Sequence, residues 1–163
     1  ADGRPRWPST ESLARVLEAV GSGFDDFAAM VEGRRGGLAP LIGFAQAGRD
    51  GFFDDAGFPV GGGWEEVRFP GLGDEAVYAL QISGDSMEPA YRAGDRIIVA
   101  PGAEVKPGDR VVAKTMGGEV MAKVLERRNT RVVDLASLNP DYPVRSFKPN
   151  EIAWIARILW AGQ

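Results

Sequence analysis

The sequence of 163 residues contains neither cysteine nor histidine. These two absences exclude a disulfide, a zinc site with cysteine ligands, a thiol nucleophile and a Ser-His-Asp triad. No metal and no cofactor are expected. Any hydrolytic chemistry must take its base from Lys, Asp, Glu, Tyr or a terminal amine. The missing cysteines also remove any argument for an oxidising compartment.

Long apolar runs are missing as well. The longest, residues 152–161, is interrupted by Arg157 and is shorter than the roughly 18 residues of a membrane span. With no recognisable signal peptide, the sequence favours a cytoplasmic protein without a membrane partner. The net charge of −4 argues against a basic nucleic-acid-binding surface formed by these residues themselves.

The abundant residues are turn formers, with 22 glycines and 11 prolines, and they favour short strands over long helices. Helical spacing of apolar residues occurs only near the start, over 13–20 and 24–31. Two helices this short bury too little apolar surface to be stable alone. We interpret residues 1–33 as the C-terminal remnant of a larger helical domain and residues 34–40 as a linker.

From residue 41 onward the pattern predicts a β domain, 41–163. Apolar runs of strand length fall at 41–44, 77–82, 96–100, 110–115, 119–125, 131–135 and 152–160. Gly117-Gly118 predicts a hairpin between two of them. Residues 48–76 are expected to be mostly loop. The predicted fold class is mainly β, with a short α-helical segment before a domain of short strands.

Lysine is scarce, with Lys106, Lys114, Lys123 and Lys148 as its four residues. A lysine acts as a general base only when neutral, and burial among apolar groups favours the neutral form. Lys123 has the most apolar sequence neighbours, and Lys114 on the opposing predicted strand is the second candidate. The alternative for both is an ammonium group that reaches water at a sheet edge.

Ser86 lies in a tight loop after the predicted strand 77–82. Gly84 permits an unusual backbone angle there. Such a loop can expose the serine hydroxyl and aim backbone N–H groups, here those of Ser86 and Met87, at a carbonyl oxygen. The alternative is an ordinary Asp-Ser turn whose side chains bond to local backbone groups.

The motif Ser-Gly-Asp-Ser-Met-Glu-Pro at 83–89 is followed by the segments 91–99 and 108–113, and Ser86 and Lys123 are 37 residues apart. This combination resembles the LexA and phage-repressor family of self-cleaving proteins. The resemblance implies a LexA/signal-peptidase-like β domain with a Ser-Lys dyad, in which Ser86 is the nucleophile and Lys123 the general base. Type I signal peptidases share a related dyad but require a membrane anchor.

Members of that family cut one Ala-Gly or Cys-Gly bond in their own chain. Of the four Ala-Gly bonds here, the resemblance selects Ala47–Gly48, because the segment 41–48 is apolar and ends in small residues. Gln46 and the stretch 49–63 depart from the family's pattern. The alternative is that residues 41–48 form a structural strand entering the domain.

Residues 7–21 look like the last helices of a phage-repressor-type helix-turn-helix domain, with another helical adaptor as the alternative. The resemblance implies a bacterial or prophage transcriptional repressor that forms a homodimer and binds operator DNA through residues upstream of Ala1. It also implies induction by a RecA filament on single-stranded DNA. Trp154 and Trp160 are candidates for the dimer interface, although core packing explains them equally well.

Three other functions stay open. The first is a repressor that never cleaves and uses its β domain for dimerisation or sensing, which the presence of both Ser86 and Lys123 disfavours. The second is an accessory protein of a damage-tolerance polymerase with the same fold. The third is a protease acting on other proteins, which the built-in substrate segment disfavours.

Overall fold

The computed structural model describes residues 15, 37–43, 47, 51–69 and 76–162. The chain divides into two compact units, residues 1–37 with 69–73, and residues 38–68 with 74–163. In the first unit, Arg15 is an exposed residue within an α-helix. The other residues of the two predicted helices lie outside the described residues. Residues 37–40 of the predicted linker lie in the first strand.

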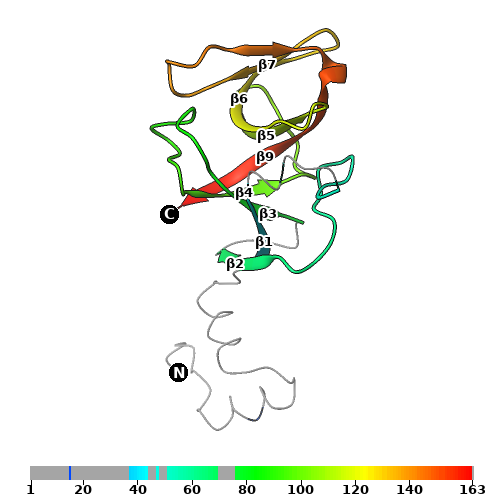
Figure 1. Cartoon of the computed structure of the whole chain (residues 1–163), viewed down its shortest axis with the longest axis vertical. Helices are drawn as coiled ribbons and strands as arrows, with labels where there is room; N and C mark the ends of the chain where they lie inside the picture. Colours follow the sequence, from blue (N-terminus) through cyan, green and yellow to red (C-terminus); the bar gives the residue numbers. More distant parts are fainter. Residues whose placement is uncertain (1–14, 16–36, 44–46, 48–50, 70–75, 163) are drawn as a thin grey trace, which may run out of the picture. The chain divides into compact units, whose positions relative to one another are not determined.

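The described strands form one nine-stranded sheet (Figure 1). They are β1 (Gly37–Gly43), β2 (Glu65–Phe69), β3 (Tyr78–Gln81), β4 (Arg96–Ala100), β5 (Arg110–Thr115), β6 (Val120–Arg128), β7 (Val133–Ala136), β8 (Arg145–Phe147) and β9 (Ile152–Gly162). A 3-10 helix, Pro149–Glu151, precedes β9. The predicted fold class, mainly β, is confirmed.

The order of the strands is β2-β1-β3-β4-β9-β5-β6-β7-β8. Strands β1 and β3 pair in parallel, whereas the pairings from β3 through β8 are antiparallel. The last strand, β9, therefore lies between β4 and β5, as its red ribbon shows in Figure 1. It joins the half of the sheet in which β3 and β4 flank the Ser86 loop to the half that carries Lys123.

Two strands were not predicted, and both are edge strands. Strand β2 falls inside the stretch expected to be mostly loop, and β8 follows a turn. Within β2, Glu65 and Glu66 are exposed while Val67 is buried. Polar side chains on an edge strand disfavour its pairing with a strand of another molecule. The sequence of such a strand therefore lacks a continuous apolar run.

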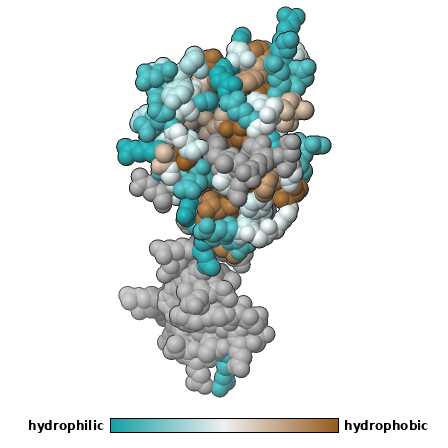
Figure 2. All heavy atoms as spheres, in the orientation of Figure 1, coloured by the Kyte–Doolittle hydropathy of each residue, from teal (hydrophilic) through white to brown (hydrophobic). Residues whose placement is uncertain are grey.

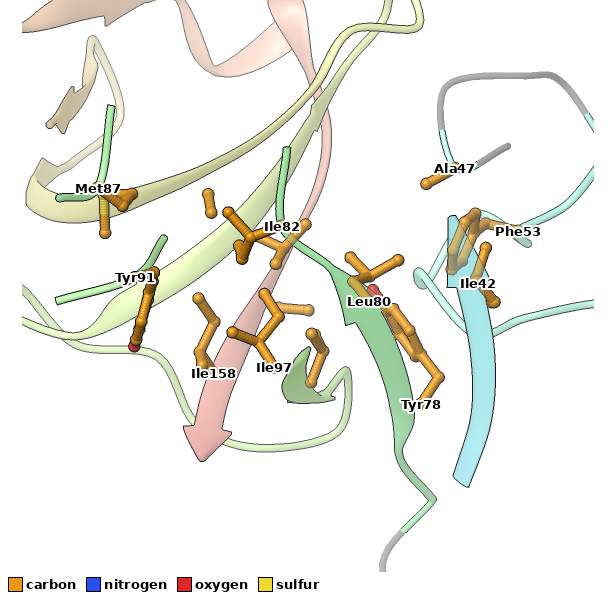
Figure 3. Close-up of a cluster of buried hydrophobic side chains, with 14 of the residues drawn as sticks. Ile42, Ala47, Phe53, Tyr78, Leu80, Ile82, Met87, Tyr91, Ile97 and Ile158 are labelled. Atoms are coloured by element: carbon orange, nitrogen blue, oxygen red, sulfur yellow. The ribbon is translucent and has the colours of Figure 1, made fainter. Parts of the chain in front are cut away.

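Buried side chains gather in two apolar clusters. The larger one combines residues of β1, β3, β4, β5, β6 and β9 with Ala47 and Phe53 (Figure 3). The ring of Phe53 packs against those of Tyr78 and Trp154, with centroids 5.1 and 5.2 Å apart. The smaller cluster is formed by Val111, Ala113, Met121, Leu125, Val133 and Leu135. Trp154 is thus a core residue, whereas Trp160 is half exposed.

Gly57 supplies a first prediction about stability. Its φ of +85° is left-handed, and an added Cβ would lie 3.0 Å from the ring of Trp154. Gly57→Ala should therefore lower the free energy of unfolding by about 1–2 kcal/mol from the backbone alone. Displacement of the Trp154 ring should add about 1–3 kcal/mol to this loss. Denaturant unfolding monitored by tryptophan fluorescence measures the total.

Gly51 provides the matched control, because it has the same φ of +85° and open space around it. Gly51→Ala should show the backbone loss without the contribution from Trp154. Equal losses in the two variants would contradict the role given to the ring contact.

Hydrophilic side chains are spread over the visible face of the described β unit, with smaller apolar areas between them (Figure 2). Among the described residues, no helix has both the length and the apolar character needed to cross a membrane.

Candidate active site

Ser86 lies in the turn that follows β3. The neck of this loop is closed by two backbone hydrogen bonds, from Ile82 N–H to Asp95 O at 2.7 Å and from Gly94 N–H to Ile82 O at 2.9 Å. Gly84 has a φ of +83°, a left-handed angle that glycine adopts without strain. Buried Met87 anchors the loop in the larger cluster and leaves Ser86 half buried beside it.

Lys123 lies in the middle of β6, paired with Val111 of β5. Side chains of a strand alternate between its two faces, so Met121 and Leu125 flank Lys123 on the same face. Both belong to the smaller apolar cluster. Lys123 is consequently buried, with 6% of its surface exposed.

The structure brings the two predicted dyad residues together. Lys123 Nζ donates a hydrogen bond of 2.9 Å to Ser86 Oγ. Among the described residues that line the cavity around Ser86, Lys123 is the one lysine. Lys114, the second candidate, is buried on β5 and is not part of that lining. Lys106 is an exposed residue that pairs with Glu104, 3.2 Å away.

The surroundings of Lys123 favour its neutral form. Burial lowers the pKa of the Lys123 amine below its ordinary value, and the charge of Arg145 lowers it further, while Glu119 acts in the opposite direction. Arg145 and Glu119 form a bidentate ion pair, with N–O distances of 2.6 and 3.0 Å. Because the opposite charges of this pair largely cancel, desolvation by burial is the main cause of the lowered pKa of Lys123.

A cavity of about 320 Å³ opens over the Ser86–Lys123 pair. Its lining comes from the Ser86 loop, from β6 and its preceding turn, from the segment between β7 and β8 and from the first residue of β8: Ile82, Ser83, Gly84, Asp85, Ser86, Met87, Glu119, Val120, Met121, Ala122, Lys123, Ser137, Tyr142, Pro143 and Arg145. The space is open enough to receive an extended peptide segment beside the serine hydroxyl.

The backbone of the serine loop offers donors to this cavity. Within the part of the chain that the structure describes, the N–H groups of Ser86 and Met87 donate no hydrogen bond. Backbone N–H groups that are not used internally can stabilise a developing oxyanion. A hydroxyl nucleophile, an amine base and such donors together form the set that acyl transfer requires.

Ala47 lies elsewhere. It is fully buried in the larger cluster, beside Phe53 and Ile42, and at the opposite end of that cluster from Met87 (Figure 3). It is not among the described residues that line the Ser86 cavity. Gly48 lies outside the described residues. The structure therefore brings Ser86 and Lys123 together and leaves Ala47 apart from them.

Residues 40–159 match the Peptidase S24-like family. The chain belongs to this family. It is also similar to LexA repressors: 34% identical over 83 residues to that of Ruegeria sp. (strain TM1040) and 43% identical over 75 residues to that of Delftia acidovorans. LexA repressor 1 of Nocardia farcinica is 40% identical over 74 residues. These matches cover 45–50% of this chain and 33–34% of the relatives, so the chain spans about a third of their length.

Sequence reasoning missed several residues of this S24-like site, all from the segment 137–145 or its partner Glu119. The sequence of the segment 137–142, with Asn139, Pro140 and Asp141, is typical of a surface turn and by itself indicates no chemistry. In the structure, Ser137 accepts a hydrogen bond of 2.8 Å from Lys123. The N–H of Asn139 donates to Ser86 O at 3.1 Å, and the hydroxyl of Tyr142 donates to Asp85. The one sequence signal was the position of Ser137 two residues after the predicted strand 131–135.

Proposed function

We propose that this chain is the self-cleaving, dimer-forming part of a transcriptional repressor, with Ser86 as nucleophile and Lys123 as general base. The observation that carries the proposal is the 2.9 Å contact between Lys123 Nζ and Ser86 Oγ. In a serine hydrolase without histidine, a desolvated lysine is the group that can take the serine proton. Membership of the Peptidase S24-like family supports this assignment.

The reaction begins when neutral Lys123 accepts the proton of the Ser86 hydroxyl as its Oγ attacks the carbonyl carbon of Ala47. The backbone N–H groups of Ser86 and Met87 stabilise the oxyanion that forms. The Lys123 ammonium then gives its proton to the amine of Gly48, and the Ala47–Gly48 bond breaks. Water hydrolyses the resulting ester on Ser86, and Lys123 again serves as base.

Cleavage requires Ala47 to leave the larger cluster and reach Ser86. The described position of Ala47 therefore corresponds to a resting state. If the segment 41–48 occupies the Ser86 cavity only about 1% of the time, cleavage is slowed about a hundredfold. This equilibrium gives the protein its latency.

The proposal extends to the organisation of the repressor. Residues 1–33 are the end of a helix-turn-helix domain that binds operator DNA, residues 34–36 are a linker, and the cleaving and homodimerising domain begins with strand β1 at residue 37. Cleavage detaches the DNA-binding domains from the dimer. The two domains then no longer bind the two operator half-sites as a linked pair, and the affinity for the operator falls. For the trigger we propose a RecA filament on single-stranded DNA, as the resemblance to the LexA and phage-repressor family implies.

The test is the intact mass of the purified chain, followed over time from pH 7 to pH 10. We expect two fragments, residues 1–47 and 48–163, that form faster as the pH rises. The rate follows the neutral fraction of Lys123, and the midpoint of its rise lies below the ordinary lysine pKa because the pKa of Lys123 is lowered. A chain that stays whole at every pH would favour the non-cleaving dimerisation module instead.

A further inference from the structure

We propose that Ser137 is a positioning residue that holds the Lys123 amine in line with the Ser86 hydroxyl. This inference rests on the proposed self-cleavage and adds a third side chain to it. Ser137 Oγ lies 2.8 Å from Lys123 Nζ, as close as the 2.9 Å contact of Nζ with Ser86 Oγ. It is half buried and lines the same cavity.

The register of β6 and β7 explains why Ser137 faces Lys123. Val124 pairs with Ala136, and continuing this antiparallel register by one residue places Ser137 opposite Lys123. Side chains of opposed residues lie on the same face, with Cβ atoms about 5 Å apart. The contact thus follows directly from strand pairing.

A β-bulge sets this register. Between Leu125 and Arg127 the pairing shifts by one residue, because Arg127 faces Asp134 while Leu125 faces Leu135. If the Arg127 register continued without the bulge, Leu138 would stand opposite Lys123 in place of Ser137. Bulges near active sites commonly re-aim a side chain in this way. Here the bulge exchanges an apolar neighbour of the lysine for a hydrogen-bond acceptor.

The hydrogen bond has a specific consequence for a lysine base. A neutral amine has two N–H donors and one lone pair, and the Cε–Nζ bond rotates freely unless a partner fixes it. When Ser137 Oγ accepts one N–H, rotation about that bond is restricted and the lone pair can be held toward Ser86. Such alignment of a base with the proton that it removes is a main source of catalytic rate.

The segment that follows Ser137 holds the nucleophile loop. Asn139 donates from its N–H to Ser86 O and from Nδ2 to Asp85 O, at 3.1 and 3.2 Å. The hydroxyl of Tyr142 donates to the Asp85 carboxylate. One short segment therefore fixes the base through Ser137 and the nucleophile loop through Asn139 and Tyr142.

The charged and titratable groups around Lys123 are few enough to interpret its titration. Glu119 and Arg145 act on it by charge, and its Nζ lies 5.7 Å from the ring of Tyr142, whose hydroxyl bonds to Asp85. The pKa of Glu119 is lowered by its bond to Arg145, the pKa of Arg145 is raised by Glu119, and the pKa of Tyr142 is raised by Asp85. The shifts of Glu119, Arg145 and Tyr142 move their pKa values away from the neutral range, whereas the lowered pKa of Lys123 moves toward it.

The first experiment compares the pH–rate profile of self-cleavage for the parent, Ser137→Ala, Ser137→Thr and Ser146→Ala. We expect Ser137→Ala to lower the plateau rate at high pH by about tenfold to a hundredfold. The midpoint of the pH–rate profile of Ser137→Ala should also move to lower pH, because the variant lacks the hydroxyl that stabilises the charged Lys123 amine by accepting a hydrogen bond. Ser137→Thr retains the hydroxyl and should restore both values.

Ser146→Ala is the matched control, since its hydroxyl bonds to Asp134 on the neighbouring strand and not to the dyad. It should leave the plateau and the midpoint unchanged. A Ser137→Ala variant with the parent's profile, or one with a lower plateau at an unchanged midpoint, would overturn the positioning role. A parent chain that does not cleave would instead defeat the proposed function itself.

The second experiment reads the contact without any cleavage. The chain has four lysines, so the ¹³Cε signal of Lys123 can be assigned by its loss in Lys123→Ala. In the Ser86→Ala background, adding Ser137→Ala should lower the titration midpoint of that signal. An unchanged or raised midpoint would show that Ser137 does not accept a hydrogen bond from the charged amine, and it would overturn the proposal even in an active protein.

Discussion

Self-cleavage at high pH is expected to stop in Ser86→Ala and to fall by about a hundredfold to ten-thousandfold in Lys123→Ala. Ser86→Ala removes the atom that forms the ester, so no acyl intermediate can arise. Lys123→Ala leaves the hydroxyl without a base, and the chain has no histidine to replace it. Intact mass spectrometry over several days at pH 10, beside the parent chain, measures both losses.

Two controls make these losses interpretable. Lys106→Ala removes an exposed lysine that pairs with Glu104 and should cleave at the parent rate. Thermal unfolding should show that Lys123→Ala stays folded, because the substitution removes an amine whose charged form is disfavoured by burial. Fragments that appear from Ser86→Ala at the parent rate would exclude this serine as the nucleophile.

Phe53→Ala is expected to have the largest effect on the resting state. Phe53 is buried between the rings of Tyr78 and Trp154 and belongs to the same cluster as Ala47. Truncating a buried phenylalanine costs about 3–5 kcal/mol of unfolding free energy. The vacated space should also weaken the packing of Ala47, and the fraction of molecules with the segment 41–48 at Ser86 should rise.

We therefore expect Phe53→Ala to be less stable in denaturant and yet to self-cleave faster at 10 °C, where it is still folded. Phe52→Ala is the matched control, since Phe52 is half buried and packs against Trp64, 5.5 Å between ring centroids. It should lose less stability and leave the cleavage rate close to the parent's. If Phe53→Ala cleaves no faster than Phe52→Ala, packing around Ala47 does not set the latency.

Local patterns predicted much of the sheet. The apolar runs at 96–100 and 110–115 coincide with β4 and β5, since central strands buried on both faces are continuously apolar. The edge strands β2 and β8 escaped prediction because their exposed residues interrupt that signal.

The site shows a similar division. Ser86 and Lys123 could be selected from a loop motif and from apolar neighbours, both of which are local in sequence. Ser137 could not, because its place beside Lys123 depends on a bulge that shifts the pairing of two strands. The burial of Ala47 was equally hidden, since the cluster that encloses it depends on Tyr78 and Trp154, which are far from Ala47 in the sequence.

The central position of β9 has a consequence for the order of synthesis. A ribosome makes the Ser86 loop first, the Lys123 strand next, and residues 152–162 after both. Since β9 supplies the backbone hydrogen bonds that join β4 to β5, the sheet half leading into Ser86 and the half holding Lys123 are not joined until that strand has emerged. Under the proposed mechanism, we therefore expect that a nascent chain does not cut itself before β9 has emerged and paired.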